Sequence, residues 1–235
     1  MTAVPPASLV PAAPTVGADG VVDALALLAA GELASFARLA TDAAHAPELR
    51  TRIVLSRMAA GDLAPLDRIE QALAGLGTPA EEVDDRIWQF RELLAEYDTR
   101  TTPRDWWERL VRTYVGYGVV VDVQRLVADG LDGEAAELAS ESLADNGLAD
   151  FVVATLGPVI QAEPQLGARL ALWGRRVVGE ALGIASRLIT TRPSLAAVAG
   201  IAESGAGLSP EQHAAFMSRL TAGHARRMKR LELTA

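Results

Sequence analysis

Apolar residues recur every three or four positions along most of the chain, which is the spacing of an amphipathic helix. In the clearest example, Leu55, Met58, Leu66 and Ile69 share one helical face. Proline, glycine and capping residues divide the pattern into segments. Helices are therefore predicted over residues 21–44, 48–73, 80–97, 103–131, 134–162 and 164–189, over a short stretch after 193, and over a last segment after 209.

Turn-forming and capping residues mark where these segments begin and end. The glycines and the proline of residues 75–79 end one helix and start the next. Ser209 and Gln212 have the spacing of a capping box, which predicts the start of the last helix. Gly157–Pro158 predicts a kink or break. The valine-rich residues 119–123 are compatible with a buried strand, but the helical spacing on both sides favours a helix.

Composition supports an all-helical fold. Alanine and leucine dominate and aromatic residues make up only 5% of the chain, a balance that favours helices over sheets. A chain of 235 residues, half of them hydrophobic, can bury a large core. We expect one all-α domain over residues 21–235, with four helices long enough for a bundle. Residues 1–20 are rich in proline and alanine and are expected to form a flexible tail.

Charge and residue usage exclude several functions. The formal net charge of −8 argues against broad electrostatic capture of nucleic acid or of an anionic membrane. The chain has no cysteine, which excludes disulfides, thiolate metal sites and cysteine nucleophiles. No apolar run is expected to span a bilayer, and residues 1–20 lack the basic start of a signal peptide. The cytoplasm is the expected location.

One acidic residue interrupts the apolar stripe of each of four predicted helices. Burying a carboxylate is costly unless it is paired, protonated or bound to a metal. Accidental placement at a solvated helix edge is the competing interpretation, but an acid on every long helix favours a shared site. These acids are Glu32, Asp62, Asp122 and Asp145.

Four inward-facing acids on four helices are the pattern of a carboxylate-bridged di-iron bundle. Such bundles take a Glu from each of two helices and an acid-x-x-His pair from each of the other two, since positions i and i+3 share one helix face. In this chain the acids stand in the expected order but both histidines are replaced. Pro65 follows Asp62, and Leu148 follows Asp145, at the positions where imidazole ligands would lie.

Six segments together have the sequence pattern of a known family, namely residues 31–33, 58–69, 106–122, 143–151, 172–181 and 216–220. They resemble the actinobacterial ferritin-like proteins that are grouped with isopentenyl-adenosine tRNA hydroxylases. The similarity extends from about residue 21 to 231 and implies a ferritin-like four-helix bundle with additional C-terminal helices. In metal-binding members it also implies a di-iron centre that activates oxygen, with acidic ligands matching Glu32, Asp62, Asp122 and Asp145.

The departures from that pattern decide the first functional hypothesis. Without either histidine the ligand set is reduced to oxygens, and Asp is shorter than Glu, so these acids are not expected to hold a catalytic metal pair. The protein is then a non-catalytic bundle with a degenerate di-iron site and no cofactor. Without a metal, the acids must be paired or protonated. The expected partners are Arg57 or Arg68 for Asp62, and Arg125 for Asp122.

Other readings stay open. The second hypothesis is a metal-dependent hydroxylase of the tRNA hydroxylase-like type, with iron as cofactor. A third is a small-molecule pocket in place of the metal site. Action through a homodimer or another protein partner is expected, whereas a nucleic-acid partner follows only from the resemblance. His213 and His224 are interpreted as surface or edge histidines, and the basic residues 226–230 as favourable charge at a helix C-terminus.

Overall fold

The computed structural model describes residues 17–203 and 205–235, and all regular structure within these ranges is helical. The elements are α1 (Ala18–His45), α2 (Leu49–Asp62), α3 (Leu66–Gly75), α4 (Ala80–Arg100), α5 (Trp106–Val111), a π-helix (Arg112–Gly116), α6 (Tyr117–Ala128), α7 (Gly133–Ser142), α8 (Leu148–Ala162), α9 (Pro164–Thr191), α10 (Pro193–Val198) and α11 (Pro210–Arg230). The prediction of an all-α fold is confirmed.

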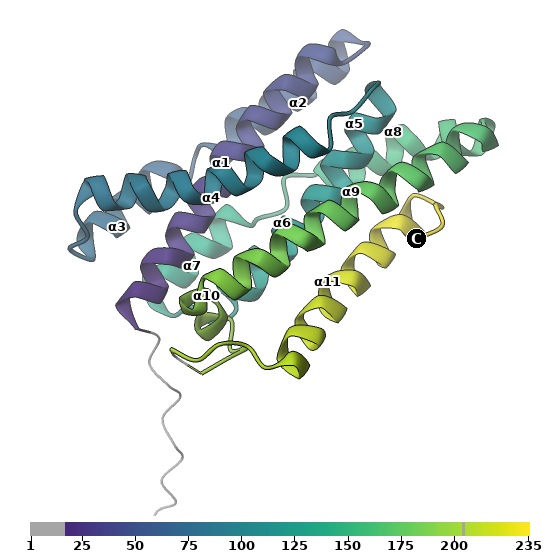
Figure 1. Cartoon of the computed structure of the whole chain (residues 1–235). Coiled ribbons are helices and arrows are strands. Elements are labelled where there is room, and N and C mark those ends of the chain that lie inside the picture. Colours follow the sequence, from purple (N-terminus) through teal and green to yellow (C-terminus); the bar gives the residue numbers. More distant parts are fainter. Residues whose placement is uncertain (1–16, 204) are drawn as a thin grey trace, which may run out of the picture.

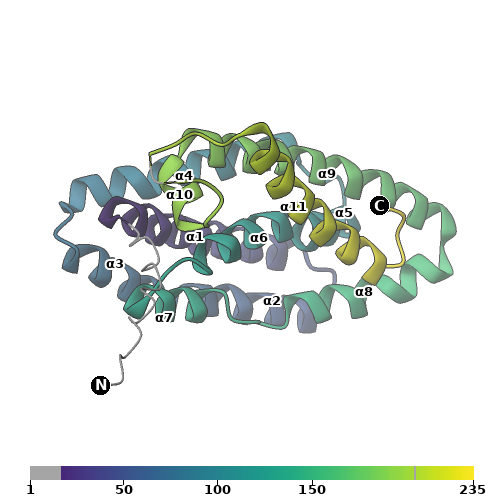
Figure 2. The same cartoon turned by 90° about the horizontal axis from the view of Figure 1, so that it is seen from below.

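The helices form a layered bundle around α1. Figure 2 shows α1 and α6 between α4 and α9 on one side and α2, α7 and α8 on the other, and Figure 1 shows α11 running beside α9. The α1 helix is rich in buried alanines, including Ala26, Ala29 and Ala30, so its neighbours can approach its backbone closely. At Gly31 an added Cβ would lie 2.0 Å from Gln124 Nε2, so this glycine allows α6 to pack against α1.

The predicted tail ends earlier than expected. Residues 18–20 already belong to α1, so the boundary at residue 20 is three residues too late. The predicted helix over residues 48–73 is divided into α2 and α3 by a turn at residues 63–65. Pro65 cannot donate a backbone hydrogen bond to a continuing helix, which accounts for the break. Residues 1–16 of the predicted tail lie outside the described residues.

Of the kink or break predicted at Gly157–Pro158, the break does not occur. The α8 helix continues through Pro158, and the interruption lies instead at residues 143–147, between α7 and α8. Gly147 has φ 78°, a conformation that glycine adopts without strain, and it directly precedes α8. This break moves Asp145 from a helix into a loop.

The predicted helix over residues 103–131 begins at Trp106 and contains a π-helix. Asp105 caps its start by accepting a hydrogen bond from Glu108 N at 2.9 Å. The π-helix ends at Gly116, where an added Cβ would lie 1.8 Å from Tyr97 Oη. A π-bulge inserts an extra residue into a helix and changes the direction of the following side chains. The valines of residues 119–123 are helical, as predicted.

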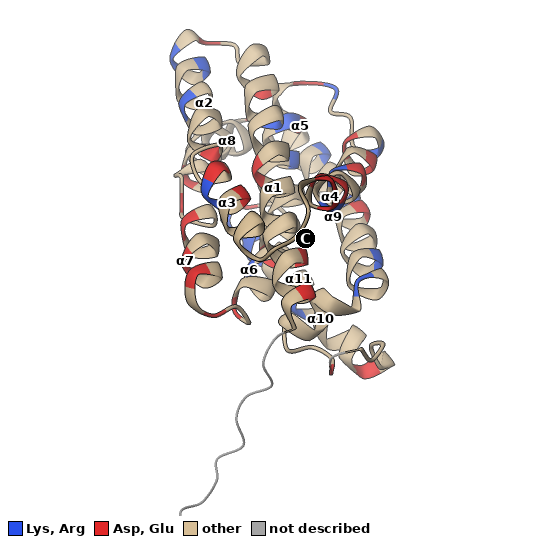
Figure 3. Ribbon diagram, turned by 90° about the vertical axis from the view of Figure 1, so that its left-hand side faces the viewer, with Lys and Arg blue, Asp and Glu red and all other residues tan. Residues whose placement is uncertain are grey.

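The C-terminal helices follow the prediction closely. Ser209 and Gln212 form the expected capping box at the start of α11. Acidic and basic residues are interspersed along the helices (Figure 3). Two of the basic residues near the end of α11 pair with acids elsewhere in the molecule. Arg227 contacts Asp122 at 2.7 Å and Arg230 contacts Asp150 at 2.5 Å.

One helix, α1, is long and apolar enough to cross a membrane by length and composition, contrary to the sequence-based expectation. It lies near the N-terminus and 67% of its most apolar window is buried within the fold. It also buries Glu32, Arg38 and Asp42, which suits the central helix of a bundle.

Candidate functional site

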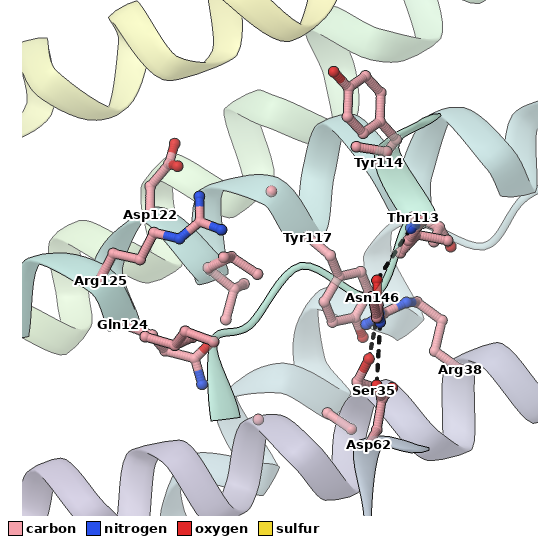
Figure 4. A pocket seen from close by; sticks show the side chains of 18 of the residues that line it. Ser35, Arg38, Asp62, Thr113, Tyr114, Tyr117, Asp122, Gln124, Arg125 and Asn146 are labelled. Atoms are coloured by element: carbon pink, nitrogen blue, oxygen red, sulfur yellow. Dashed lines mark hydrogen bonds between the residues drawn. The ribbon is translucent and has the colours of Figure 1, made fainter. Parts of the chain in front are cut away.

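A cavity of about 290 Å³ lies where the middle of α1 meets the end of α2, the π-helix, α6 and the 143–147 loop. All four predicted acids contribute to its lining, as does Leu148 at the start of α8. Pro65 does not line the cavity and is buried in the turn between α2 and α3. Figure 4 shows the central part of this site. The shared location agrees with the prediction, but the four acids differ in their surroundings.

Glu32 and Asp62 are buried side by side on the same part of the cavity. Their exposed fractions are 7% and 9%. Glu32 accepts a hydrogen bond from the last residue of α7, and Asp62 accepts one from the loop that follows α7. Ser142 Oγ donates to Glu32, and Asn146 Nδ2 donates to Asp62 Oδ1 at 3.2 Å. Asp62 Oδ2 has no partner among the described residues.

Burial raises the pKa of both carboxyl groups. Burial raises the pKa of Glu32 to about 7. The hydrogen bond from Ser142 and the charge of Arg38 lower this pKa, whereas the nearby Asp62 raises it further. Burial also raises the pKa of Asp62, against the opposing effects of Ser35, Arg38 and Asn146. The pair therefore carries less than two negative charges near neutral pH.

Arg38 is the buried cation of the cavity, and sequence reasoning missed it. Its exposed fraction is 8%, and its guanidinium carbon lies 3.8 Å from the centroid of the Tyr117 ring. Nη2 donates to Ser35 Oγ at 2.8 Å, whereas Nε has no partner among the described residues. Tyr117 is held in turn by its hydroxyl group, which donates to Asp98 Oδ1 at 2.6 Å.

Within the described chain, no carboxylate oxygen lies within 4.0 Å of an Arg38 nitrogen, so Arg38 forms no ion pair there. Its charge nevertheless acts on both Glu32 and Asp62 through space, since it lowers the pKa of each. An arginine one turn beyond Ser35, on a helix stripe that is otherwise buried, was the available signal in the sequence. The search for acids alone passed over it.

Asp122 is engaged on the far side of the cavity. Arg227 of α11 donates to it through two nitrogens, at 3.1 and 2.7 Å. Figure 4 shows the Asp122 side chain directed away from Asp62 and Asn146. The predicted pairing with Arg125 is wrong, because Arg227 occupies both carboxylate oxygens. Gly118 and Gly223 make room for this pair, since a Cβ at either would clash with it.

Asp145 lies in the α7–α8 loop rather than on a helix. Its side chain is exposed and accepts a hydrogen bond from Gly147 N at 2.9 Å, which shapes the loop. The predicted partners of Asp62 are also wrong. Arg68 pairs with Glu141, and Arg57 is exposed. Neither arginine lines the cavity.

The donor set does not match a di-iron centre. Such a centre needs carboxylates and imidazoles converging from four helices, whereas here two carboxylates converge and a guanidinium shares their cavity. No group of three or more metal-ligating side chains occurs in the part of the chain that the structure describes.

The histidines lie elsewhere. His213 bonds Ser186 at 2.7 Å through its Nε2. His224, predicted to lie at the surface or a helix edge, is buried in α11, and burial lowers its pKa.

Comparison with known families identifies the class of protein. The family described as the ferritin-like domain of actinomycetes matches residues 17–201. The match covers most of the chain, and the chain therefore belongs to this family. The α11 helix lies beyond the matched region. It contains residues 216–220, one of the segments on which the resemblance to the tRNA hydroxylase-like proteins was based. A search of curated proteins finds no match.

Proposed function

We infer that the protein is a non-catalytic ferritin-like bundle that acts by binding, with the Arg38 guanidinium supplying the positive charge that metal ions supply in a di-iron bundle. The observation that carries this proposal is the buried Arg38 in the same cavity as Glu32 and Asp62. Arginine remains charged at every pH at which proteins fold. A metal pair placed beside it would meet electrostatic repulsion.

The state of the acids supports the same proposal. Glu32 accepts a hydrogen bond from Ser142, and Asp62 accepts one from Asn146. Asp122 is occupied by Arg227, and Asp145 is occupied by its own loop. Each of the four acids thus has a partner other than a metal.

The second candidate is the metal-dependent hydroxylase of the tRNA hydroxylase-like type, with iron as cofactor. One observation favours it, namely that all four acids line one cavity. It requires Asp122 and Asp145 to leave their present partners and Arg38 to withdraw. We also propose that the protein forms a homodimer or binds another protein, and that it is located in the cytoplasm. Light scattering measures the oligomeric state directly.

Metal content separates the two candidates. The protein is purified after growth with added iron and manganese, and bound metal is measured by elemental mass spectrometry. We expect far less than one equivalent, with the same value for Glu32→Gln, for Asp62→Asn and for the control Glu70→Gln, which alters an exposed acid on α3. Two equivalents of iron that disappear in the first two variants and persist in the control would contradict the proposal and favour the hydroxylase.

A further inference from the structure

The cavity has the size of a site for a small molecule. Its volume of about 290 Å³ lies near the lower end for ligand pockets, about 300 Å³. Its lining combines a few charged groups with an apolar wall. Leu94, Val120, Val121, Leu148 and Ala149 contribute to that wall. A site of this kind suits a ligand with one polar group and a short apolar body.

The Arg38 guanidinium is a buried polar group of the cavity with few hydrogen-bond partners. Within the described chain its only hydrogen bond runs from Nη2 to Ser35 Oγ, although a guanidinium carries five N–H donors. Figure 4 shows Arg38 directed from α1 into the centre of the site, toward Asn146 and Tyr117. The Tyr117 ring covers one face of the guanidinium, so its edge is the part left for hydrogen bonding. That edge fits a planar anion such as a carboxylate.

The acids of the cavity already accept hydrogen bonds from protein groups. Glu32 accepts from Ser142 and Asp62 from Asn146, whereas Asp145 is tied to its own loop. The unpartnered Asp62 Oδ2 has almost no accessible surface, and the same holds for Arg38 Nε, so a ligand would meet Arg38 at Nη1 and Nη2. A cationic ligand would therefore find few open acceptors, and it would meet the fixed charge of Arg38.

The mouth of the cavity adds a second cation. Arg125 of α6 lines the cavity, is exposed and forms no ion pair in the described part of the chain. The two other arginines of the lining, Arg227 and Arg230, are paired with Asp122 and Asp150. Arg125 is thus placed to attract an anion before it reaches Arg38.

We propose that this cavity binds a small organic carboxylate, whose oxygens accept hydrogen bonds from Arg38 and whose apolar body lies against the wall formed by α6 and the start of α8. This inference rests on the proposed function in one respect, because it requires a cavity free of metal. It goes further by naming the anchor residue and the chemical class of the ligand.

The test compares ligands that differ in charge on one scaffold. Binding of benzoate, benzamide and benzylamine is measured by calorimetry and thermal shift at constant ionic strength, with acetate and hexanoate as further carboxylates. We expect benzoate or hexanoate to bind at least tenfold more tightly than the neutral amide, because a charge-assisted hydrogen bond to arginine is lost in the amide. Tighter binding of benzylamine would overturn the proposal, as would no binding by any of the carboxylates.

Variants then locate the anchor. Arg38→Met should weaken carboxylate binding at least tenfold, and Arg125→Gln about twofold to threefold with a smaller dependence on salt. Arg50→Gln, which removes an exposed arginine from α2 outside the cavity, should have no effect. Arg38→Lys keeps the charge without the planar donor pair and should show an intermediate loss. Circular dichroism identifies any variant that fails to fold, and Arg38→Lys then carries the test.

Equal affinity in the wild type and in both Arg38 variants would place the carboxylate elsewhere and overturn the proposal. Failure here is distinguishable from failure of the proposed function. Stoichiometric iron would contradict both the proposed function and the carboxylate site. A metal-free protein without Arg38-dependent carboxylate binding would contradict the carboxylate site alone.

Discussion

Two regions of α1 bury acidic residues in opposite ways. Asp42 has an exposed fraction of 1% and is fully partnered. Arg109 Nη1 donates to Oδ1 at 3.2 Å and Thr113 Oγ1 donates to Oδ2 at 2.7 Å. Nearer the middle of α1, Glu32 is buried beside Asp62. One carboxylate oxygen of Asp62 has no hydrogen-bond partner among the described residues. Arg38, the cation that acts on both acids, forms no ion pair with either.

The difference separates a structural acid from a site. Asp42 links α1 to α5 and the π-helix, so its charge stabilises the packing of these helices. Glu32 and Asp62 border a cavity instead, and their charge is only partly compensated. Incompletely satisfied polar groups beside a cavity are typical of binding sites, whereas burial of an acid alone is not.

The largest expected effect is at Asp42. Asp42→Ala leaves the Arg109 charge and the Thr113 hydroxyl without their partner, and breaking a buried pair in this way costs about 3–5 kcal/mol. Asp62→Asn should change the free energy of unfolding by less than about 1 kcal/mol, because its charge is already disfavoured by burial. Urea denaturation at pH 7 measures both. A larger loss for Asp62→Asn than for Asp42→Ala would reverse the comparison.

A smaller, pH-dependent effect is expected at Glu32. Its pKa is 4.5 in a model peptide and about 7 in the fold, so between these values the native state holds more protons than the unfolded chain. Stability contributed by the protonated group is thus lost as the pH rises through this window. Glu32→Gln keeps the neutral form and should be more stable than the wild type by about 1–3 kcal/mol at pH 8. Near pH 4.5 the two should be equal.

Chemical denaturation across pH 4.5–8 checks this prediction. The exposed acid variant Glu70→Gln should follow the wild type at every pH. An equal difference between Glu32→Gln and the wild type at all pH values would show that the pKa of Glu32 is not raised.

Much of the fold could be predicted because helical periodicity and capping depend on local sequence. The capping box at Ser209 and the helix over residues 119–123 are examples. The break predicted at Gly157–Pro158 shows where local sequence is not enough to place the end of a helix. Pro158 is tolerated inside α8. The loop at 143–147, in contrast, depends on the left-handed conformation of Gly147 and on the hydrogen bonds that Asp145 and Asn146 accept from the backbone N–H groups of Gly147 and Leu148.

The candidate site could be predicted only in part. The four periodic acids all line one polar cavity, although Asp145 does so from an exposed loop rather than from a helix. Their partners could not be read from neighbouring positions, because Arg227 reaches Asp122 from 105 residues away in the chain. Arg38 was missed because a single arginine on a buried stripe has no motif, and its significance depends on the three-dimensional contact with Tyr117.

The measurement that tests the central claim most directly is a double-mutant cycle between Arg38→Met and the combined change Glu32→Gln with Asp62→Asn, read as the free energy of unfolding at pH 8. If Arg38 supplies the charge that compensates the acids, Arg38→Met should be at least about 1 kcal/mol more destabilising when the acids are present than when they are neutral. Effects that add within about 0.5 kcal/mol would mean that the guanidinium and the acids are independent, and would contradict the account.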